Sequence, residues 1–332
     1  MSKEKFSIGS ETVIGMVHCL PLPTTAGFDG DYQKILDRAV QDAVTLEKAG
    51  VDAVIVENMG DTPFSALLNK AQLAALTAAT LAVKNAVNIP VGVDAAFNDC
   101  EANIAIAAIT GASFIRVPVF VDTVIFTDGV INPCAKKCME YRKAMGKEDI
   151  KVLADVQVKH AHMVLPYITV EQSAKEAVDS GADGIIVTGT QIGEETPLDL
   201  IKRVKNVVKV PVFAGSGVKA ENIKDQLQIA DGAIIGSSLK EGGIISNPIS
   251  YDLVKKVLDG LKEFIYEIKG LNDIEQCIKS FLGVKDVVIV PGNVYENPET
   301  IKELGRAAAN YIKNLIKDKD IIAITGGSTI KE

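Results

Sequence analysis

Several features that mark particular classes of protein are missing from the sequence. Its five cysteines are odd in number and form no C-x-x-C pair, so they do not suit a disulfide framework or a zinc site. We therefore expect reduced thiols in a cytoplasmic protein. There is no long run of basic residues, and the net charge is −8. This balance argues against a broad surface for nucleic acid, although a small anion can still bind locally.

A long apolar segment that could cross a membrane is also missing. The longest apolar stretch, Ala71 to Val87, is rich in alanine and is interrupted by polar residues that include Lys84. It predicts a buried helix and not a membrane span. The first residues, Met1 to Gly9, are polar, and we find no secretory signal.

What is present fits a globular α/β protein. The chain has 332 residues, 47% of them apolar and 23% charged, which is enough to bury a sizeable core. Short apolar runs alternate with longer helical patterns, as where Thr12 to Val17 is followed by Tyr32 to Ala49. A helix stop followed by a buried strand recurs along the chain, for example at Gly50 to Ala53. The pattern predicts successive βα units.

Eight strands follow from this pattern. Their predicted positions are Thr12–Val17, Ala53–Glu57, Val91–Asp94, Phe114–Val117, Lys151–Val156, Gly184–Thr188, Val212–Ala214 and Gly232–Gly236. Eight parallel strands within about 250 residues predict a TIM (β/α)8 barrel, which we place at residues 1–268. A closing helix is expected near Pro248 to Tyr266, and Lys269-Gly270 marks the boundary.

Residues 269–332 predict a short, incomplete α/β segment. It ends in a glycine-rich turn, Thr325 to Thr329. The expected helices and strands are Asp273–Leu282, Val287–Val290, Pro298–Ile316 and Ile321–Ile324. So few elements cannot bury a normal core alone, which indicates a truncated or vestigial domain.

Polar residues at the ends of the predicted strands are the candidates for a functional site. In a TIM barrel the active site lies at the C-terminal ends of the strands. For any one of these residues, a solvent-exposed loop position is an equally good interpretation, so the cluster carries the weight. The candidates for catalysis are His18, Glu57, Asp155, Lys159 and His160. The candidates for substrate binding are Asn58, Asp61, Asp94, Arg116, Thr188 and Thr190.

Lys159 has two chemical interpretations. A desolvated lysine can be a neutral nucleophile, whereas a charged one binds an anion. Asp155, Gln157 and Lys159 share one face if the strand stays extended, and Asp155 would then keep Lys159 charged. We therefore favour a cationic anchor and expect that borohydride will not trap a carbonyl substrate on Lys159.

A metal site and a thiol pair are weaker candidates. His160 and His162 lie on one side of an extended segment and could hold a divalent metal together with a carboxylate from Glu57, Asp94 or Asp155. A site without metal fits the sequence as well. Cys134 and Cys138 lie one helical turn apart and are interpreted as packing thiols.

Two glycine-rich loops after the last two predicted strands suggest an anion site. Glycines let backbone N–H groups approach a phosphate, and barrels commonly bind phosphate on this pair of loops. The same glycines could simply permit tight turns. The expected phosphate-binding residues are Gly215, Ser216, Gly217, Gly236 and Ser237.

These motifs resemble the BtpA/SgcQ family of predicted TIM-barrel proteins over about residues 8–262. The resemblance begins at Ile14 to Pro23, continues through Val56 to Phe64 and Gly111 to Val117, and includes the segment Ala154 to Ala161. It departs at Asp94, where the family usually has asparagine, and at Gln157, which replaces a frequent histidine. The resemblance implies a link to photosystem I biogenesis or to sugar-uptake genes, neither of which fixes a reaction.

The C-terminal segment resembles the start of the sugar-binding domain of SorC-type transcriptional regulators. The resemblance lies in Val288 to Gly292, Leu304 to Ala309 and Thr325 to Thr329. Most of that domain and its helix-turn-helix are absent from the sequence, so a DNA-binding regulator is not expected, whereas a split or frameshifted fusion is compatible with the pattern.

Two functions of different classes are therefore expected. The first is a cytoplasmic lyase or isomerase, of the aldolase, epimerase or isomerase type, that acts on a phosphorylated sugar or another small phosphorylated metabolite. The second is an assembly factor or ligand sensor without catalysis that acts through a protein partner. Both a monomer and a homo-oligomer are compatible with the sequence. Convergence of Glu57, Asp155 and Lys159 on a common point would favour the enzyme.

Overall fold

The protein chain is described here from a computed structural model, over residues 12–159, 161–189 and 195–269. It divides into two compact units, Met1–Gly260 and Leu261–Glu332. The first contains the barrel. The elements expected after residue 269 lie outside the described residues, as do His160 and Thr190.

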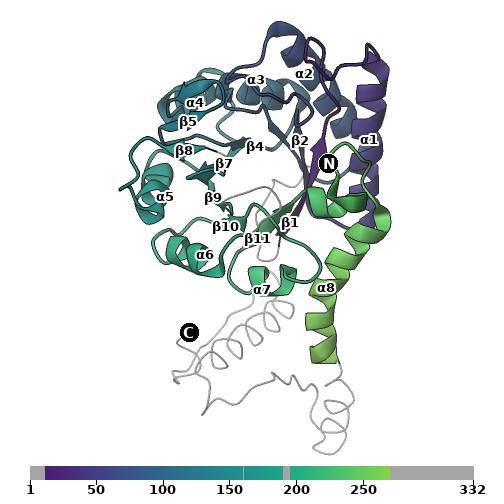
Figure 1. The fold of residues 1–332 in the computed structure, drawn as a ribbon, viewed down its shortest axis with the longest axis vertical. Coiled ribbons are helices and arrows are strands. Elements are labelled where there is room, and N and C mark those ends of the chain that lie inside the picture. The colour runs from purple at the N-terminus through teal and green to yellow at the C-terminus, as the bar shows by residue number, and fades with distance from the viewer. Residues whose placement is uncertain (1–11, 160, 190–194, 270–332) are drawn as a thin grey trace, which may run out of the picture. The chain divides into compact units, whose positions relative to one another are not determined.

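The first unit is a closed barrel of eight parallel strands, which confirms the predicted TIM barrel (Figure 1). Its strands follow one another around the barrel in the order β1-β2-β3-β4-β7-β9-β10-β11, and β11 pairs with β1. Each lies within one residue of its predicted position. The strands are β1 (Thr12–His18), β2 (Ala53–Glu57), β3 (Val91–Asp94), β4 (Phe114–Val117), β7 (Lys151–Val156), β9 (Gly184–Val187), β10 (Val212–Ala214) and β11 (Gly232–Ile235).

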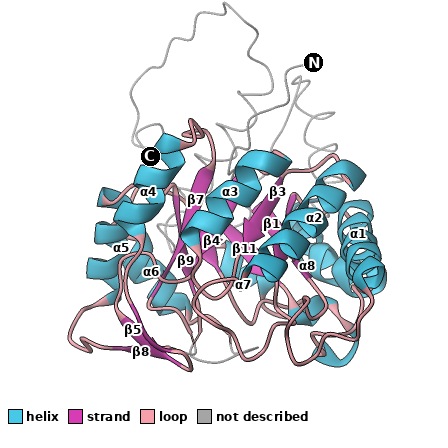
Figure 2. Ribbon diagram, turned by 90° about the horizontal axis from the view of Figure 1, so that it is seen from above, coloured by secondary structure: helices cyan, strands magenta, loops and turns pink. Residues whose placement is uncertain are grey.

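Helices surround the strands, as Figures 1 and 2 show. They are α1 (Tyr32–Ala49), α2 (Lys70–Ala86), α3 (Cys100–Thr110), α4 (Ala135–Ala144), α5 (Val170–Asp179), α6 (Leu198–Lys205), α7 (Ile223–Leu227) and α8 (Tyr251–Lys269). Local sequence sets their ends: Asp31 caps α1 by accepting a hydrogen bond from the Lys34 N–H, and Gly50 ends it with a φ of 104°. Helix α2 buries Leu76, Ala79, Thr80 and Val83, so the expected burial holds for one face of the helix.

Large apolar side chains fill the barrel interior. They include Phe114 and Phe213, both fully buried. Gly92 lies against the Phe114 ring, and a Cβ there would collide with it. Alternation of small and large residues thus lets the interior close to native packing density. The barrel below the strand ends is therefore a packed core, and the mouth is the part left for a site.

A small antiparallel sheet was not predicted from the sequence. It has the order β6-β5-β8, formed by β6 (Gly129–Ile131), β5 (Val124–Phe126) and β8 (His162–Met163). The Phe126 ring stacks on Phe97 with centroids 4.0 Å apart, beside the barrel mouth. Strands of two or three residues are too short for the alternation that reveals a strand in sequence.

A buried ion pair anchors the loop that follows β11. This loop begins with two short 3₁₀ helices, η1 (Ser237–Leu239) and η2 (Glu241–Gly243). The Lys240 ammonium is fully buried, lies 3.6 Å from the Asp42 carboxylate on α1 and donates to the Asn247 carbonyl. Asp42 also accepts the Ile249 N–H. These contacts fix both ends of the loop against α1.

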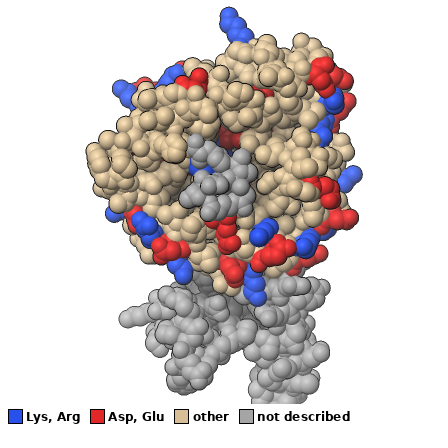
Figure 3. All heavy atoms as spheres, viewed as in Figure 1, with Lys and Arg blue, Asp and Glu red and all other residues tan. Residues whose placement is uncertain are grey.

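Two surface properties bear on the expected partners. Within the described part of the chain, no helix is both long and apolar enough to cross a membrane. On the face shown in Figure 3, acidic and basic side chains are interspersed around the rim, and no broad basic patch is visible. This face therefore gives no support to nucleic-acid binding.

Candidate functional site

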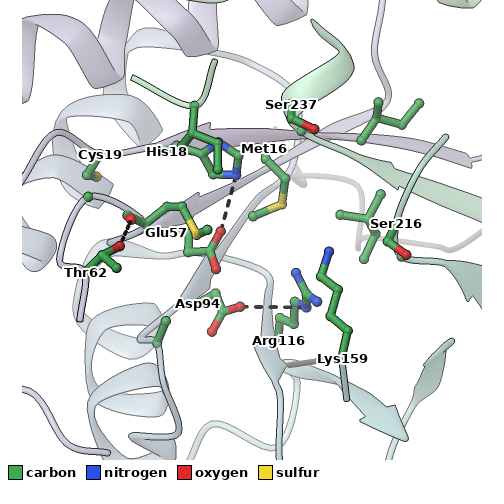
Figure 4. A pocket seen from close by; sticks show the side chains of 18 of the residues that line it. Met16, His18, Cys19, Glu57, Thr62, Asp94, Arg116, Lys159, Ser216 and Ser237 are labelled. Carbon is green, nitrogen blue, oxygen red and sulfur yellow. Dashed lines mark hydrogen bonds and ion pairs between the residues drawn. The ribbon is translucent and has the colours of Figure 1, made fainter. Parts of the chain in front are cut away.

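A cavity of about 850 Å³ lies at the C-terminal ends of the barrel strands. The strand register pairs His18 with Glu57 and Glu57 with Asp94, so three polar side chains form one row across β1, β2 and β3. The loops after β7, β10 and β11 complete the wall (Figure 4). The residues expected from the sequence that line this cavity are His18, Glu57, Asp94, Arg116, Lys159, Gly215, Ser216, Gly217, Gly236 and Ser237.

Arg116 is the central cation of the cavity, and Asp155 holds it. The guanidinium donates to both Asp155 oxygens, at 2.9 and 2.8 Å. Asp155 is 1% exposed and does not line the cavity. The expected catalytic role of Asp155 is therefore corrected to a positioning role, because both of its oxygens are occupied by Arg116.

Asp94 is buried without a hydrogen bond. It is 0% exposed, and neither carboxylate oxygen has a hydrogen-bond partner among the described residues. The nearest cation is Arg116, whose Nε lies 3.7 Å from Oδ2 and is already bonded to Asp155. Burial and then the neighbouring Glu57 raise the pKa of Asp94 well above its ordinary value. Asp94 is thus a candidate for a carboxylic acid that keeps its proton near neutral pH.

The pKa of Glu57 is shifted in the opposite direction. Burial opposes its ionisation, but the hydrogen bond with His18 and the charges of Arg116 and Lys159 outweigh it and lower the pKa of Glu57. His18 Nε2 lies 3.4 Å from Glu57 Oε2. Asp94, whose pKa is raised, and Glu57, whose pKa is lowered, lie on neighbouring strands, so their surroundings shift the two carboxyl groups in opposite directions, as an acid–base pair requires.

Lys159 enters the cavity after the chain turns. Strand β7 ends at Val156, and Gln157 has a φ of 47°, so the expected extended face of Asp155, Gln157 and Lys159 is wrong. The Gln157 amide instead donates to the Ile168 carbonyl. Figure 4 shows the Lys159 side chain beside Arg116. Burial, followed by the Arg116 charge, lowers the pKa of Lys159.

The phosphate candidates differ in what they can offer an anion. The Gly215 N–H donates to the Val187 carbonyl, and a Cβ at Gly215 would collide with Ile186, so close packing explains this glycine. The Ser216 hydroxyl accepts the Gly189 N–H at 2.6 Å. By contrast, the N–H groups of Gly217 and Ser237 have no partner among the residues that the structure describes. Both N–H groups are therefore available to an anion.

The two loops are also tied together. The Ser238 hydroxyl donates to the Val218 carbonyl at 2.6 Å, which joins the loop after β11 to the loop after β10. Gly217 has a φ of 63°, a conformation that other residues adopt with strain. Gly236 lies against His18, whose Cε1 would be 2.9 Å from an added Cβ. Sequence reasoning missed Ser238 because its partner is 20 residues away.

Three of the expected substrate-binding residues hold loops in place instead. Asn58 hydrogen-bonds with Asp61 and with both backbone groups of Ala96, and Asp61 also accepts the Leu22 N–H. The Thr188 hydroxyl accepts the Lys159 N–H. None of the three lines the cavity. Their roles are corrected to positioning, because their polar groups bond to the protein.

The expected metal site cannot be followed at one of its two histidines. His162 is exposed on β8, and His160 lies outside the described residues. Within the described ranges, no group of three or more His, Cys, Asp or Glu side chains is arranged to hold a metal ion. Sequence reasoning also missed the apolar part of the wall, which includes Phe64, Phe97 and Phe126 from loops and from the small sheet.

The buried Asp94 predicts an unusual pH dependence of stability. A raised pKa means that the folded protein binds this proton more tightly than the unfolded chain does. The stabilising contribution is therefore present at low pH and is lost as the pH rises through the folded-state pKa. We expect Asp94→Asn to be more stable than the wild type at pH 8, by about 1 kcal/mol, with the gain shrinking as the pH falls.

Urea unfolding across a pH series measures this gain. Asp29→Asn is the matched control: Asp29 is exposed, and its hydrogen bond with Lys34 lowers its pKa, so its replacement should give no gain at pH 8. An Asp94→Asn variant that is less stable than the wild type at pH 8 would show that Asp94 is ionised and stabilising in the fold.

Residues 9–263 match the BtpA family. The chain belongs to the BtpA family. An uncharacterized protein from Pyrococcus furiosus is 41% identical over 244 residues, which is 73% of this chain and 92% of that relative. The photosystem I biogenesis protein BtpA of Synechocystis is 37% identical over 280 residues, 83% of this chain and 96% of that relative.

The remaining comparisons concern the C-terminal segment and the fold. Residues 266–332 match a family described as "Putative sugar-binding domain", which confirms the second resemblance. The (S)-3-O-geranylgeranylglyceryl phosphate synthase of Thermoplasma acidophilum aligns with the BtpA-family barrel at a TM-score of 0.49 and 16% identity, covering 76% of this chain and 94% of that one. We draw no functional conclusion from this structural likeness.

Proposed function

We propose that this BtpA-family barrel is an enzyme that moves a proton on a small phosphorylated metabolite, as an isomerase or epimerase of a phosphorylated sugar does. The observation that carries the proposal is the pairing of Glu57, whose pKa is lowered, with a buried Asp94 that has a raised pKa and no hydrogen bond among the described residues, in one row at the barrel mouth. Acid–base catalysis needs two groups in opposite protonation states at one place.

The residues divide the chemistry between them. Glu57, held by His18, takes a proton from a carbon next to a carbonyl group, and its acquired proton can be returned on the same or a neighbouring carbon. Asp94 donates a hydrogen bond, and then its proton, to the carbonyl oxygen as negative charge develops there. The guanidinium of Arg116, fixed by Asp155, stabilises that charge without having to reorganise.

The phosphate would bind where the loops after β10 and β11 line the cavity. The free N–H groups of Gly217 and Ser237 supply donors there, and Lys159 supplies a cation. The cavity of about 850 Å³ has room for a small sugar phosphate. A phosphate held at one end fixes where the reacting carbon lies, which is the positional advantage that such enzymes use.

Ser237→Asp tests the phosphate part of the proposal. The new carboxylate would stand beside the free N–H groups and repel the anion, whereas Ser237→Ala removes only the hydroxyl. We expect pentose and hexose phosphates to raise the melting temperature of the wild type and of Ser237→Ala, and to lose this effect with Ser237→Asp. Ligand at about 100 times its dissociation constant stabilises a protein by about 2.7 kcal/mol. An equal shift in all three proteins would refute the site.

Gly215 is unsuitable for this test. A side chain there would collide with Ile186, so loss of folding would be confused with loss of binding. Ser237 is partly exposed, and its hydroxyl makes no hydrogen bond with the described residues, so the alanine variant should fold normally.

A second candidate function is favoured by one observation at Lys159. The expectation of a fully charged lysine rested on Asp155, but Asp155 is bound to Arg116, and burial with Arg116 lowers the pKa of Lys159. A lysine with a lowered pKa could form a Schiff base with a carbonyl substrate, as in lysine-dependent aldolases. Asp155 and Glu57 still favour its charged form.

Borohydride trapping distinguishes the two roles of Lys159. We keep the expectation that no adduct forms when the protein is incubated with phosphorylated ketoses and borohydride, while Lys159→Met weakens their binding. Mass spectrometry of the digested protein is the measurement. A reduced adduct on Lys159 that is absent from Lys159→Met would make the protein a lysine-dependent aldolase.

Action as an assembly factor without catalysis is supported by a different finding, the name of the Synechocystis relative, a photosystem I biogenesis protein. Convergence of Glu57, Asp155 and Lys159 would favour an enzyme. Glu57 and Lys159 line one cavity, whereas Asp155 does not line it and accepts hydrogen bonds from Arg116. Deuterium exchange into a bound sugar phosphate separates the two functions, because an assembly factor would bind the ligand without exchanging its protons.

A further inference from the structure

A second group of reactive side chains lies away from the barrel mouth, where α3 and α4 pack together. Cys100 is the first residue of α3, Cys134 caps α4, and Cys138 lies in its first turn. All three are free thiols, with exposures of 3%, 8% and 0%. The structure thus brings Cys100 to the pair that the sequence left without a role. No sequence spacing indicated this, because Cys100 is on a different βα unit.

The three thiols face one another. Cys134 and then Cys138 lie close enough to the Cys100 sulfur to lower the pKa of Cys100. The nearby Lys137 ammonium acts in the same direction, as does the position of Cys100 at a helix N-terminus. The converse holds for the partners, since the hydrogen bond with Cys100 and burial raise the pKa of Cys134.

Two of the three buried cysteines border a cavity. A second cavity, of about 270 Å³, is lined by Cys100 and Cys134 together with Lys137 and Asn98. Cys138 does not line it and is fully buried. The cavity is large enough for a hydroperoxide, whose oxygen a thiolate attacks. The three cysteines therefore differ: Cys100 lines the cavity and has a lowered pKa, Cys134 lines the same cavity, and Cys138 is fully buried outside it.

We propose that Cys100 and Cys134 form a peroxide-reactive dithiol, in which Cys100 attacks and Cys134 resolves. The Cys100 sulfur attacks one oxygen of a hydroperoxide, the O–O bond breaks, and the alcohol or water leaves with a proton, so that Cys100 becomes a sulfenic acid. The Cys134 sulfur then attacks the Cys100 sulfur, the S–O bond breaks, and water leaves with the Cys134 proton. Two thiols are oxidised to one disulfide, and one peroxide is reduced.

The reaction would change contacts near the barrel mouth. The Cys134 thiol donates to the Val119 carbonyl at 3.3 Å, and the Asn98 amide donates to the same oxygen at 3.0 Å. Asn98 follows Phe97, which lines the barrel-mouth cavity. Oxidation removes the Cys134 donor. The modification site is separate from the proposed proton-transfer site and does not depend on it.

The test treats the full chain, in a Cys277→Ser background, with hydrogen peroxide. Four cysteines then remain, Cys19, Cys100, Cys134 and Cys138. We expect the loss of two thiols by titration in denaturant, and a peptide that links Cys100 to Cys134 in a digest without reductant. Oxidation of the Cys134→Ser variant should stop at the sulfenic acid, which dimedone labels on Cys100. The Cys100→Ser variant should lose no thiol and gain no dimedone label.

Cys19 is the internal control. Like Cys100 it is 3% exposed and lines a cavity, but burial followed by the charge of Asp61 raises its pKa, so its thiol should survive the same treatment. Circular dichroism checks that each variant folds. Oxidation of Cys19 as fast as Cys100 would overturn the proposal. A disulfide to Cys138 in place of Cys134, or no dimedone label on Cys100 in Cys134→Ser, would overturn it as well.

Discussion

Replacing Glu57 with glutamine is expected to abolish most of the proton exchange that we propose the protein catalyses on a phosphorylated sugar. Glutamine keeps the shape and a hydrogen bond with His18 but cannot accept a proton. The loss of a general base typically costs about 10²- to 10⁴-fold in rate. Nuclear magnetic resonance in D₂O measures the exchange directly, as the disappearance of the proton signal next to the carbonyl group.

Ligand binding separates loss of chemistry from loss of the site. Because the phosphate donors Gly217 and Ser237 are on other loops, Glu57→Gln should still be stabilised by the sugar phosphate. Full exchange activity in Glu57→Gln would show that another group is the base. A variant that neither exchanges nor binds would place Glu57 in binding and count against its role as a base.

Arg116→Met is expected to destabilise the fold by about 3–5 kcal/mol, the cost of leaving a buried charge without its partner. Asp155 would lose both hydrogen bonds while remaining 1% exposed. Burial of an unpaired carboxylate is expensive, so a strong loss follows even though an intact buried pair contributes little. The free energy of unfolding in urea, at neutral pH, is the measurement.

The double variant Arg116→Met with Asp155→Leu provides the control. It removes both charges together, and most of the lost stability should return. Equal destabilisation by the double variant and by Arg116→Met would mean that Arg116 acts through packing of its side chain and not through its charge. A loss below about 1 kcal/mol in Arg116→Met would match an exposed ion pair instead of a buried one.

The barrel could be predicted from the sequence because residues next to the strands mark where they begin. Gly50, Gly111 and Gly181 end the preceding helices with positive φ angles, and buried apolar runs follow them. The row of His18, Glu57 and Asp94 also follows from strand ends, since neighbouring parallel strands end at the same edge. A prediction that needs only local signals and barrel closure therefore succeeds.

The partners within the site could not be predicted in the same way. Alternation along an extended strand put Asp155 and Lys159 on one face, but the turn at Gln157 breaks the alternation. Arg116 and Asp155 are 39 residues apart, and the choice of partner depends on which carboxylate meets the guanidinium with two oxygens. The contact of Cys100 with α4 is likewise a result of how helices pack on neighbouring strands.

Exchange in D₂O, with phosphorylated sugars and their unphosphorylated counterparts compared side by side, tests the central claim most directly. The claim is that one cavity holds both a phosphate site and an acid–base pair. It predicts exchange of the proton next to the carbonyl group with at least one phosphorylated sugar, little with its unphosphorylated counterpart, and loss of this exchange in Ser237→Asp. A phosphorylated sugar that stabilises the wild type but exchanges no proton, or equal exchange without the phosphate, would contradict it.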